Sequence, residues 1–186
     1  MYRRTLMLAG VSLTAAALAA GTAHAQKPDL NNTIYLDLKY GRVVIELFPD
    51  LAPKTVQRIK TLADQGFYDN TPFHRVIEGF MAQGGDPTGT GTGGSKLPDL
   101  PAEFTTERHF LRGTCGMART SDPNSGNSQF FIMFAPAPSL DGKYTIWGQV
   151  VRGMEFVDQI KRGSGDSGMV DDPDRIVRMR VAADAK

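Results

Sequence analysis

Short segments in which apolar and polar residues alternate recur along this chain, and they constrain its fold more than any other feature. The segment 33–38 places three aliphatic residues on one face of a strand. A turn at 40–42 and an apolar segment at 43–48 follow, so the pair predicts an antiparallel hairpin. The segment 175–182 alternates again. Its predicted core face consists of Val177, Met179 and Val181.

Two helices are predicted between the first and last strands. Pro53 suits a first helical position, because its missing N–H would have no partner there, and Gly66 suits the end of the helix. Apolar residues recur between them at spacings of three and four. They are Val56, Ile59, Leu62 and Ala63. A second helix is predicted over 154–161, with Val157 and Ile160 facing inward.

The organisation of the chain favours a single, mainly β domain. Many short strands separated by glycine- and proline-containing turns are typical of a barrel or a sandwich, and a closed barrel leaves no strand edge exposed. The sequence contains no internal repeat and no linker that would divide the domain.

The first 25 residues are typical of a secretory signal peptide. Arg3 and Arg4 precede an apolar, alanine-rich stretch over 5–20, and Ala23 and Ala25 form a small-x-small cleavage site. Cleavage after Ala25 would leave residues 26–186 in the periplasm or outside the cell. No second long apolar stretch follows, so no membrane association is expected after cleavage. The two arginines do not decide between the general and the twin-arginine export routes.

Charge and residue counts exclude several kinds of function. The net charge is +1, which gives no electrostatic basis for binding nucleic acid or acidic membranes. Cys115 is the only cysteine, so no intrachain disulfide can form, and its small and apolar neighbours predict a buried structural thiol. After cleavage His74 and His109 are the remaining histidines, too few for a typical zinc site.

The segment 73–86, FHRVIEGFMAQGGD, places one arginine among strand-forming residues. If the strand is regular, Arg75, Ile77 and Gly79 share a face. Taken alone, Arg75 could be a solvated surface charge, since most arginines are exposed.

Two further segments combine apolar strands with polar turns. In 116–134, Phe130 and Phe131 are neighbours and therefore point to opposite faces of a strand, so one can fill the core while the other lines a cleft. The alternative is that both simply pack in the interior. In 140–150, Asp141 and Gly142 predict a hairpin turn before a strand that begins near Tyr144.

These three segments, in this order and spacing, resemble the cyclophilin family, and the extended turn in 116–134 is similar to bacterial exported members. The resemblance is close in FHRVIEGFMAQGGD, in MAR…SQFFI and in LDGKYTIWGQV, and it covers nearly all of 26–186. It implies a closed, eight-stranded antiparallel β-barrel capped by two α-helices. It also implies a peptidyl-prolyl cis-trans isomerase that acts on unfolded or proline-containing polypeptides and assists the folding of exported proteins.

The resemblance implies a site as well, carried over residue by residue. The residues expected to be catalytic are Arg75, Phe80, Gln83 and Phe131. Those expected to bind substrate are His74, Met81, Ala118, Arg119, Gln129, Leu140 and Tyr144. Phe131, Met81 and Leu140 would form the walls of a proline pocket, which Phe80 would support. At position 119 the backbone, more than the side chain, is expected to hold the peptide.

These residue types suit a reaction that makes and breaks no covalent bond. Resonance opposes rotation about a peptide bond with a barrier of about 18–20 kcal/mol. In the twisted state the prolyl nitrogen regains its lone pair, and a guanidinium such as that of Arg75 can donate to it. Gln83 could orient Arg75 or bind the substrate backbone. Such a mechanism needs no nucleophile, metal or cofactor.

Three other functions are alternatives to an isomerase. The glycine-rich loop 84–95 lacks the Gly-Lys-Ser/Thr ending of a phosphate-binding loop, and the chain has no GxSxG motif of a hydrolase. The more serious alternative is a chaperone of the same fold that binds proline-containing segments with little catalysis. The intact set of Arg75, Gln83 and Phe131 favours catalysis.

Three positions depart from well-known eukaryotic cyclophilins. Ser139 occupies the place of a tryptophan that contacts cyclosporin, and Tyr144 that of a histidine. Weak cyclosporin binding with retained activity is therefore expected. Glu78 replaces a proline and should alter only the local loop, and Trp147 is expected in the wall or the core. A monomer is the default assembly.

Overall fold

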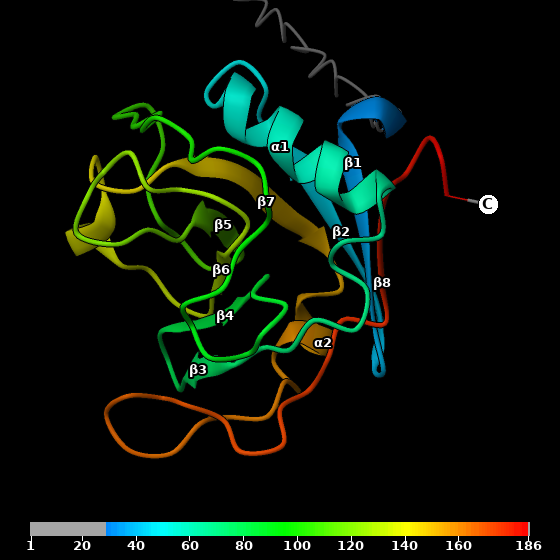
Figure 1. Cartoon of the computed structure of the whole chain (residues 1–186), viewed down its shortest axis with the longest axis vertical. Helices are drawn as coiled ribbons and strands as arrows, with labels where there is room; N and C mark the ends of the chain where they lie inside the picture. Colours follow the sequence, from blue (N-terminus) through cyan, green and yellow to red (C-terminus); the bar gives the residue numbers. More distant parts are fainter. Residues whose placement is uncertain (1–28, 186) are drawn as a thin grey trace, which may run out of the picture.

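A computed structural model describes residues 29–185 of the chain, and in this part it contains eight strands, two α-helices and two short 3₁₀-helices (Figure 1). The strands are β1 (Thr33–Leu38), β2 (Gly41–Leu47), β3 (Arg75–Ile77), β4 (Met81–Gly84), β5 (Thr114–Met117), β6 (Phe130–Met133), β7 (Ile146–Arg152) and β8 (Arg178–Val181). The helices are α1 (Pro53–Asp64), α2 (Met154–Val157), η1 (Leu30–Asn32) and η2 (Pro138–Leu140). The predicted signal peptide lies outside the described residues.

All eight strands belong to one curled antiparallel sheet, in the order β3-β4-β6-β5-β7-β2-β1-β8. The mainly β class, the eight strands and the two helices are thus confirmed. Strands β3 and β8 are the two ends of this order. Near them the segment 70–73 bonds to 174–176: the Phe73 N–H donates to the Asp174 carbonyl at 2.9 Å, and the Ile176 N–H to that of Thr71 at 2.9 Å. Because these bonds lie outside the named strands, a fully closed barrel stays a prediction.

The first hairpin and the first helix agree with the sequence pattern. Strands β1 and β2 pair from Thr33 opposite Glu46 to Leu38 opposite Gly41. Helix α1 contacts β8 and buries the predicted apolar face (Figure 1). Its first turn has no side-chain cap of its own. Instead the Glu103 carboxylate accepts from two backbone N–H groups at the start of the helix, which satisfies donors that otherwise lack partners.

The second helix is shorter than predicted. It ends at Val157, although Val157 and Ile160 are both buried as expected. After the helix the backbone bonds tighten to a three-residue spacing, as in the Ile160 N–H donating to the Val157 carbonyl. The Arg162 guanidinium then binds the carbonyls of Asp158 and Ile160, so these groups need no further helical turn.

The expected alternation fails at Val177, whose side chain is 59% exposed while Ile176 is fully buried. The chain changes its hydrogen-bonding partner between these two residues. The Ile176 N–H donates to the Thr71 carbonyl, whereas the Val177 N–H donates to the carbonyl of Asp37 in the first hairpin. Strand β8 therefore begins only at Arg178, and the predicted core position at Val177 is wrong.

Two turns also differ from the predictions. The residues after Ile77 form a tight turn over 78–80 between β3 and β4, so Gly79, with φ of 68°, does not share a strand face with Arg75. Asp141 and Gly142 do form a turn, but it follows η2 and does not join two paired strands, since β5 lies between β6 and β7 in the sheet.

The interior contains two apolar clusters, which lie on opposite faces of β6. The larger one fills the space between the sheet and α1 and includes Phe130, Cys115 and Trp147, all fully buried. This confirms that Cys115 is buried and that Trp147 is a core residue. The smaller cluster surrounds Phe131. Among residues 29–185, no helix is long and apolar enough to cross a membrane.

Candidate functional site

A pocket of about 130 Å³ opens beside the smaller apolar cluster, and nine side chains line it. They are Arg75, Phe80, Met81, Gln83, Ala118, Arg119, Phe131, Leu140 and Tyr144. All nine were expected in the site from the sequence. They come from segments spread over 75–144, so the fold alone brings them together.

The register of the sheet places the polar side chains at the edge of this pocket in line with Phe131 in its apolar wall. Arg75 on β3 lies opposite Gln83 on β4, and Gln83 lies opposite Phe131 on β6. Phe131 in turn faces Gly116 on β5. A Cβ at Gly116 would overlap the Cζ of Phe131, so glycine at this position lets the ring lie over β5. Arg75, Gln83 and Phe131 therefore form one row across three strands.

A chain of hydrogen bonds holds the polar edge. Arg75 Nη1 donates to Gln83 Oε1 at 3.3 Å, and Gln83 Nε2 donates to Gln129 Oε1 at 2.9 Å. Gln129 Nε2 donates to the carbonyls of Gly91 and Gly93 at 3.0 and 2.9 Å. Because a guanidinium can only donate and a carbonyl can only accept, both ends of the chain require these amide orientations. Gln83 therefore contacts the Arg75 side chain directly, and its role in orienting Arg75 stays a prediction.

The chain ends on the glycine-rich loop, which Asp86 organises. This carboxylate is fully buried and accepts from the N–H groups of Thr88, Gly91 and Gly93 and from the Thr88 hydroxyl. Burial alone would raise the pKa of Asp86, but these bonds outweigh burial and hold its pKa below the ordinary value. The sequence analysis missed Asp86; a single acid before a run of glycines was the available signal.

Two expected substrate-binding residues do not line the pocket. Gln129 lies behind Gln83 and borders a neighbouring hollow. His74 is only 2% exposed, and its two ring nitrogens have no hydrogen-bond partner. Burial lowers the pKa of His74, so the ring is neutral near pH 7. A direct contact of either residue with substrate stays a prediction.

Aromatic side chains build the apolar walls. The Phe131 ring stacks on Phe110 with centroids 5.6 Å apart and meets Tyr144 edge-on at 5.8 Å. The Arg119 guanidinium lies 4.4 Å from the centre of the Tyr144 ring and donates to the Lys143 carbonyl. The Arg119 side chain therefore holds the segment that carries Tyr144.

A larger hollow of about 450 Å³ adjoins the pocket and shares Gln83, Ala118 and Arg119 with it. The sequence analysis identified four residues of its lining, which are Gln83, Ala118, Arg119 and Gln129. It did not identify most of the polar residues that line this hollow. They are Thr92, Ser95, Asp99, Thr120, Ser125 and Asn127.

The chemistry of the site follows from these groups. Two of the five N–H groups of Arg75 bind protein acceptors, which leaves three for a ligand. Cys115 is not suited to act as a nucleophile, because it is buried and burial raises the pKa of its thiol. Within residues 29–185 no three His, Cys, Asp or Glu side chains cluster to hold a metal. The arrangement can seat a small apolar ring and offer fixed cationic donors beside it.

Comparison with protein families gives one match over residues 33–181, to the cyclophilin-type peptidyl-prolyl cis-trans isomerase family. A probable peptidyl-prolyl cis-trans isomerase from Brucella suis is 49% identical, with 100% of this chain and 99% of the relative covered. A peptidyl-prolyl cis-trans isomerase-like 1 protein from Gibberella zeae is 42% identical, over 82% of this chain and 96% of the relative.

Solved structures agree with these relatives. A cyclophilin-type isomerase from Cryptosporidium parvum, crystallised in the presence of the dipeptide Ala-Pro, matches with a TM-score of 0.75 and 34% identity, over 80% of this chain and 98% of that one. A cyclophilin from Hirschia baltica matches with a TM-score of 0.76 and 29% identity, over 86% and 77% of the two chains.

Proposed function

The chain belongs to the cyclophilin-type peptidyl-prolyl cis-trans isomerases and is an enzyme of that class, and we propose that it works by a non-covalent mechanism centred on Arg75. The apolar pocket holds the proline ring while the preceding carbonyl rotates. The Arg75 guanidinium donates to the prolyl nitrogen once twisting has restored its lone pair, and so stabilises the twisted state over both planar isomers.

The observation that carries this proposal is the row Arg75–Gln83–Phe131. It places a charged donor at one edge of the pocket, with Gln83 between that donor and Phe131 in the pocket wall. The donor is also preorganised, because Gln83 and the chain behind it hold the guanidinium before any substrate arrives. A donor that is already oriented does not have to reorganise during the reaction, which is why such groups lower barriers effectively.

Proline-containing polypeptides are the proposed substrates. The Ala-Pro dipeptide used with the Cryptosporidium parvum structure supports this class. A pocket of about 130 Å³ suits a small ring, while the adjoining polar hollow leaves room for residues beside the proline. The reaction uses no cofactor, since each step is a rotation that forms and breaks no covalent bond.

The test is Arg75→Ala in a protease-independent prolyl isomerisation assay, with Arg42→Ala as the matched control. Arg42 is also hydrogen-bonded to a neighbour, Asp37, but lies on the first hairpin outside the pocket. Loss of one preorganised donor should lower kcat/KM by roughly 10²–10³. The control should stay near wild type.

Near-wild-type turnover by folded Arg75→Ala would overturn the assignment of Arg75. The same proteins should be tested for suppression of aggregation of an unfolded client. If wild type suppresses aggregation and shows no turnover, a binding chaperone replaces the enzyme.

Export is a second part of the proposal, and it rests on residues 1–25 alone. Cleavage near Ala25 delivers a monomeric isomerase to the periplasm or the exterior, where it assists the folding of exported proteins. Mass spectrometry of the protein from a periplasmic or culture fraction should find Gln26 as the first residue. Full-length protein retained in the cytoplasm would contradict this part and leave the catalytic proposal unaffected.

A further inference from the structure

A loop at the far end of the chain lies directly against the strand that carries Arg75. This loop, residues 163–170, passes below β3 in Figure 1 and bonds to it on both sides of Arg75. The Val76 N–H donates to the Gly168 carbonyl at 2.7 Å, and the Val170 N–H donates to the His74 carbonyl at 3.0 Å. The loop therefore acts as an extra backbone partner for the short end strand of the sheet.

The loop also binds the Arg75 side chain. Arg75 Nε donates to the Ser167 carbonyl oxygen at 2.9 Å. We propose that the 163–170 loop is a positioning element for Arg75, with the Ser167 carbonyl as the acceptor that fixes the plane of the guanidinium. The inference rests on the catalytic role proposed for Arg75 above.

The geometry explains why a second anchor matters. Gln83 binds Nη1 at 3.3 Å, a single contact that leaves the guanidinium free to pivot. Because the guanidinium is planar, a second bond at Nε fixes its orientation. The remaining N–H groups are then held in one direction at the edge of the pocket. Small displacements of a catalytic group can lower rates strongly, so this fixation bears on turnover.

Two glycines make the close approach possible. Gly168 has φ of 68°, and a Cβ there would overlap the Cγ1 of Ile77 and lie 3.1 Å from the Val76 carbonyl oxygen. A Cβ at Gly163 would overlap the Gly168 carbonyl oxygen. A larger residue at Gly168 would push the loop away from β3, and one at Gly163 would force apart the two sides of the loop itself. Either change would move the Ser167 carbonyl.

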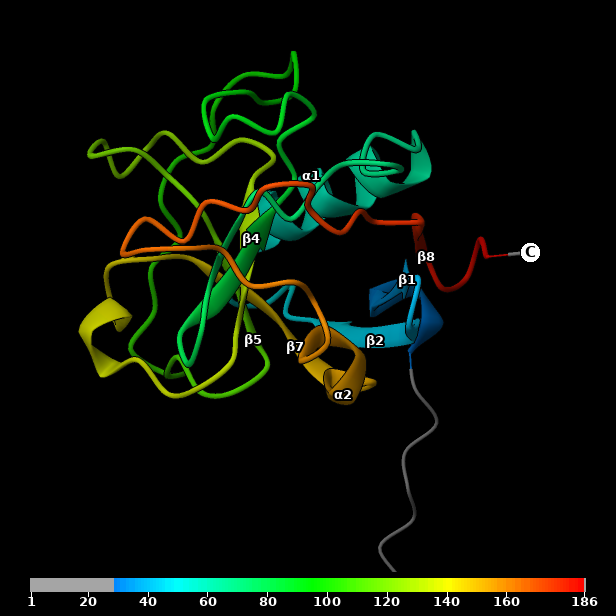
Figure 2. The same ribbon diagram turned by 90° about the horizontal axis from the view of Figure 1, so that it is seen from below.

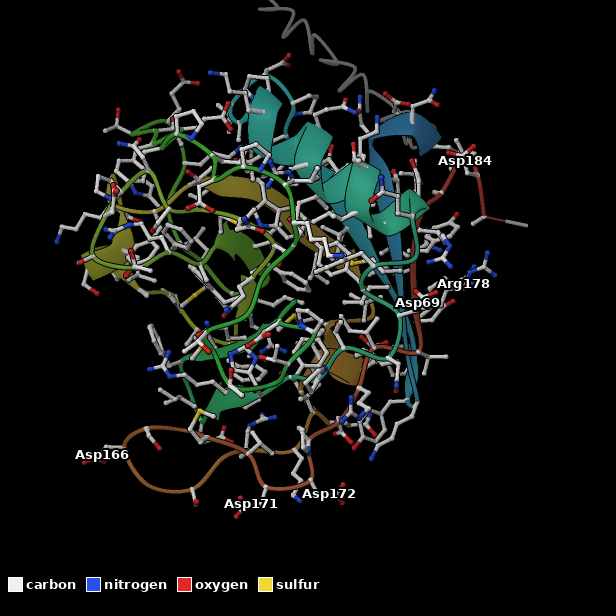
Figure 3. All side chains as sticks on the ribbon, viewed as in Figure 1. Asp69, Asp166, Asp171, Asp172, Arg178 and Asp184 are labelled. Carbon is white, nitrogen blue, oxygen red and sulfur yellow. The ribbon has the colours of Figure 1, made fainter. Side chains whose placement is uncertain are left out.

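The acidic side chains of this region take no part in the contact. Figure 3 shows Asp166, Asp171 and Asp172 pointing away from the sheet, so the loop meets β3 through its backbone. The start of the loop is tethered by Arg162, whose Nε binds the Glu78 carboxylate at 2.6 Å and whose guanidinium lies 4.2 Å from the centre of the Phe134 ring. Figure 2, seen from below, shows the loop crossing in front of β4.

The test compares Gly168→Ala with Gly165→Ala. Gly165 belongs to the same loop and has φ of 61°, but a Cβ there would meet nothing within 4 Å. Both variants place alanine at a similar positive φ, and only Gly168→Ala should displace the loop. NMR exchange on an Ala-Pro peptide at saturating enzyme gives kcat, and titration gives Kd. We expect Gly168→Ala to lower kcat about 10-fold relative to Gly165→Ala, with Kd for the peptide changed less than about 2-fold.

A second comparison uses the Arg75→Ala background. If the loop acts through Arg75, adding Gly168→Ala there should cause no further loss of kcat. A further loss of similar size would show a general structural effect and overturn the inference. If the two glycine variants have equal kcat while Arg75→Ala is impaired, the role of the loop is overturned and the proposed mechanism at Arg75 stands. Unimpaired Arg75→Ala would instead overturn the proposed mechanism.

One measurement uses only the wild-type enzyme and needs no substitution in the loop. In the wild-type enzyme the Arg75 Nε–H should give a resolved NMR signal that exchanges slowly with water, because it donates to Ser167. The Nε–H of Arg152, an exposed arginine whose side chain has no hydrogen-bond acceptor among residues 29–185, provides the comparison. Exchange of the Arg75 signal as fast as that of Arg152 would contradict the anchoring.

Discussion

The two faces of strand β6 perform different tasks although their side chains are neighbours in sequence. Phe130 is fully buried and meets Tyr68, Phe73 and Trp147 edge-on, with centroids 5.6 to 6.4 Å apart. Phe131 packs on Phe110 but also forms part of the pocket wall. One face thus stabilises the fold, and the other carries the proposed site.

The segments that pack against the two faces of β6 also differ. The core face is enclosed by strands and by α1, together with Tyr68 and Phe73 from the segment between α1 and β3. The walls around Phe131 come largely from segments between strands: Phe110, Leu140 in η2, and Tyr144. A site built in this way depends on single contacts that hold loops, whereas the core depends on the sum of many apolar contacts.

The largest expected effect separates the two faces directly. Phe130→Ala should lower the free energy of unfolding by about 3–5 kcal/mol, because it leaves a cavity in an enclosed core. Phe131→Ala should cost less stability, since its surroundings already open to water. It should instead lower kcat/KM by roughly 10- to 200-fold through loss of the pocket wall. Denaturant unfolding and the isomerisation assay measure both quantities.

Phe130→Leu and Phe131→Leu serve as milder variants if either alanine variant fails to fold. Folded Phe130 variants should keep turnover near wild type. Similar losses of stability and of turnover from both positions would show that the two faces are not functionally distinct.

A smaller effect is expected at the rim of the pocket. Ser139 is exposed on η2 beside Leu140, and its side chain does not line the pocket. Ser139→Trp should add a large apolar face and an indole N–H for cyclosporin, tightening its Kd by about 10-fold or about 1.4 kcal/mol. Isomerase activity should stay within about 2-fold, since the pocket walls are unchanged. Tight, nanomolar cyclosporin binding by wild type would contradict this prediction.

The smallest effect concerns pH and the turn after η2. The Phe110 N–H and His109 Nδ1 both bind the Asp141 carboxylate at 2.8 Å and hold its pKa below the ordinary value. A lowered folded-state pKa means that Asp141 stabilises the protein above its unfolded pKa of about 3.9. That contribution is lost as the pH falls through the folded-state pKa.

Asp141→Asn should therefore be slightly less stable than wild type at pH 7, and the difference should shrink as the pH falls below about 3.9. Urea unfolding of both proteins from pH 7 to about pH 2 measures the difference. A difference that does not shrink over this range would show that the charge of Asp141 contributes nothing.

Much of this molecule could be predicted because its determinants are local. Period-two alternation correctly predicted β1, and the spacing of apolar residues predicted the buried face of α1. The neighbours Phe130 and Phe131 were assigned to opposite faces for the same reason. The pocket-lining residues came from the resemblance to a family: of the eleven site residues carried over, nine line the pocket.

Two of the errors share one cause, which is contact between distant segments. Val177 was misplaced because the chain exchanges Thr71 for Asp37 as a hydrogen-bonding partner at that point. The second helix stops early because Arg162 folds back on its carbonyls. Neither event has a signal in the local pattern.

The sequence by itself determined which residues face inward and which chemistry the chain can support, because side-chain period and residue type are local properties. Only the tertiary structure decided how the Arg75 guanidinium is held. Its two anchors, Gln83 and the Ser167 carbonyl, lie 8 and 92 residues away along the chain. Sheet register places Gln83 beside Arg75, and the close approach of the 163–170 loop places the Ser167 carbonyl there. Both contacts depend on packing between segments rather than on any segment alone.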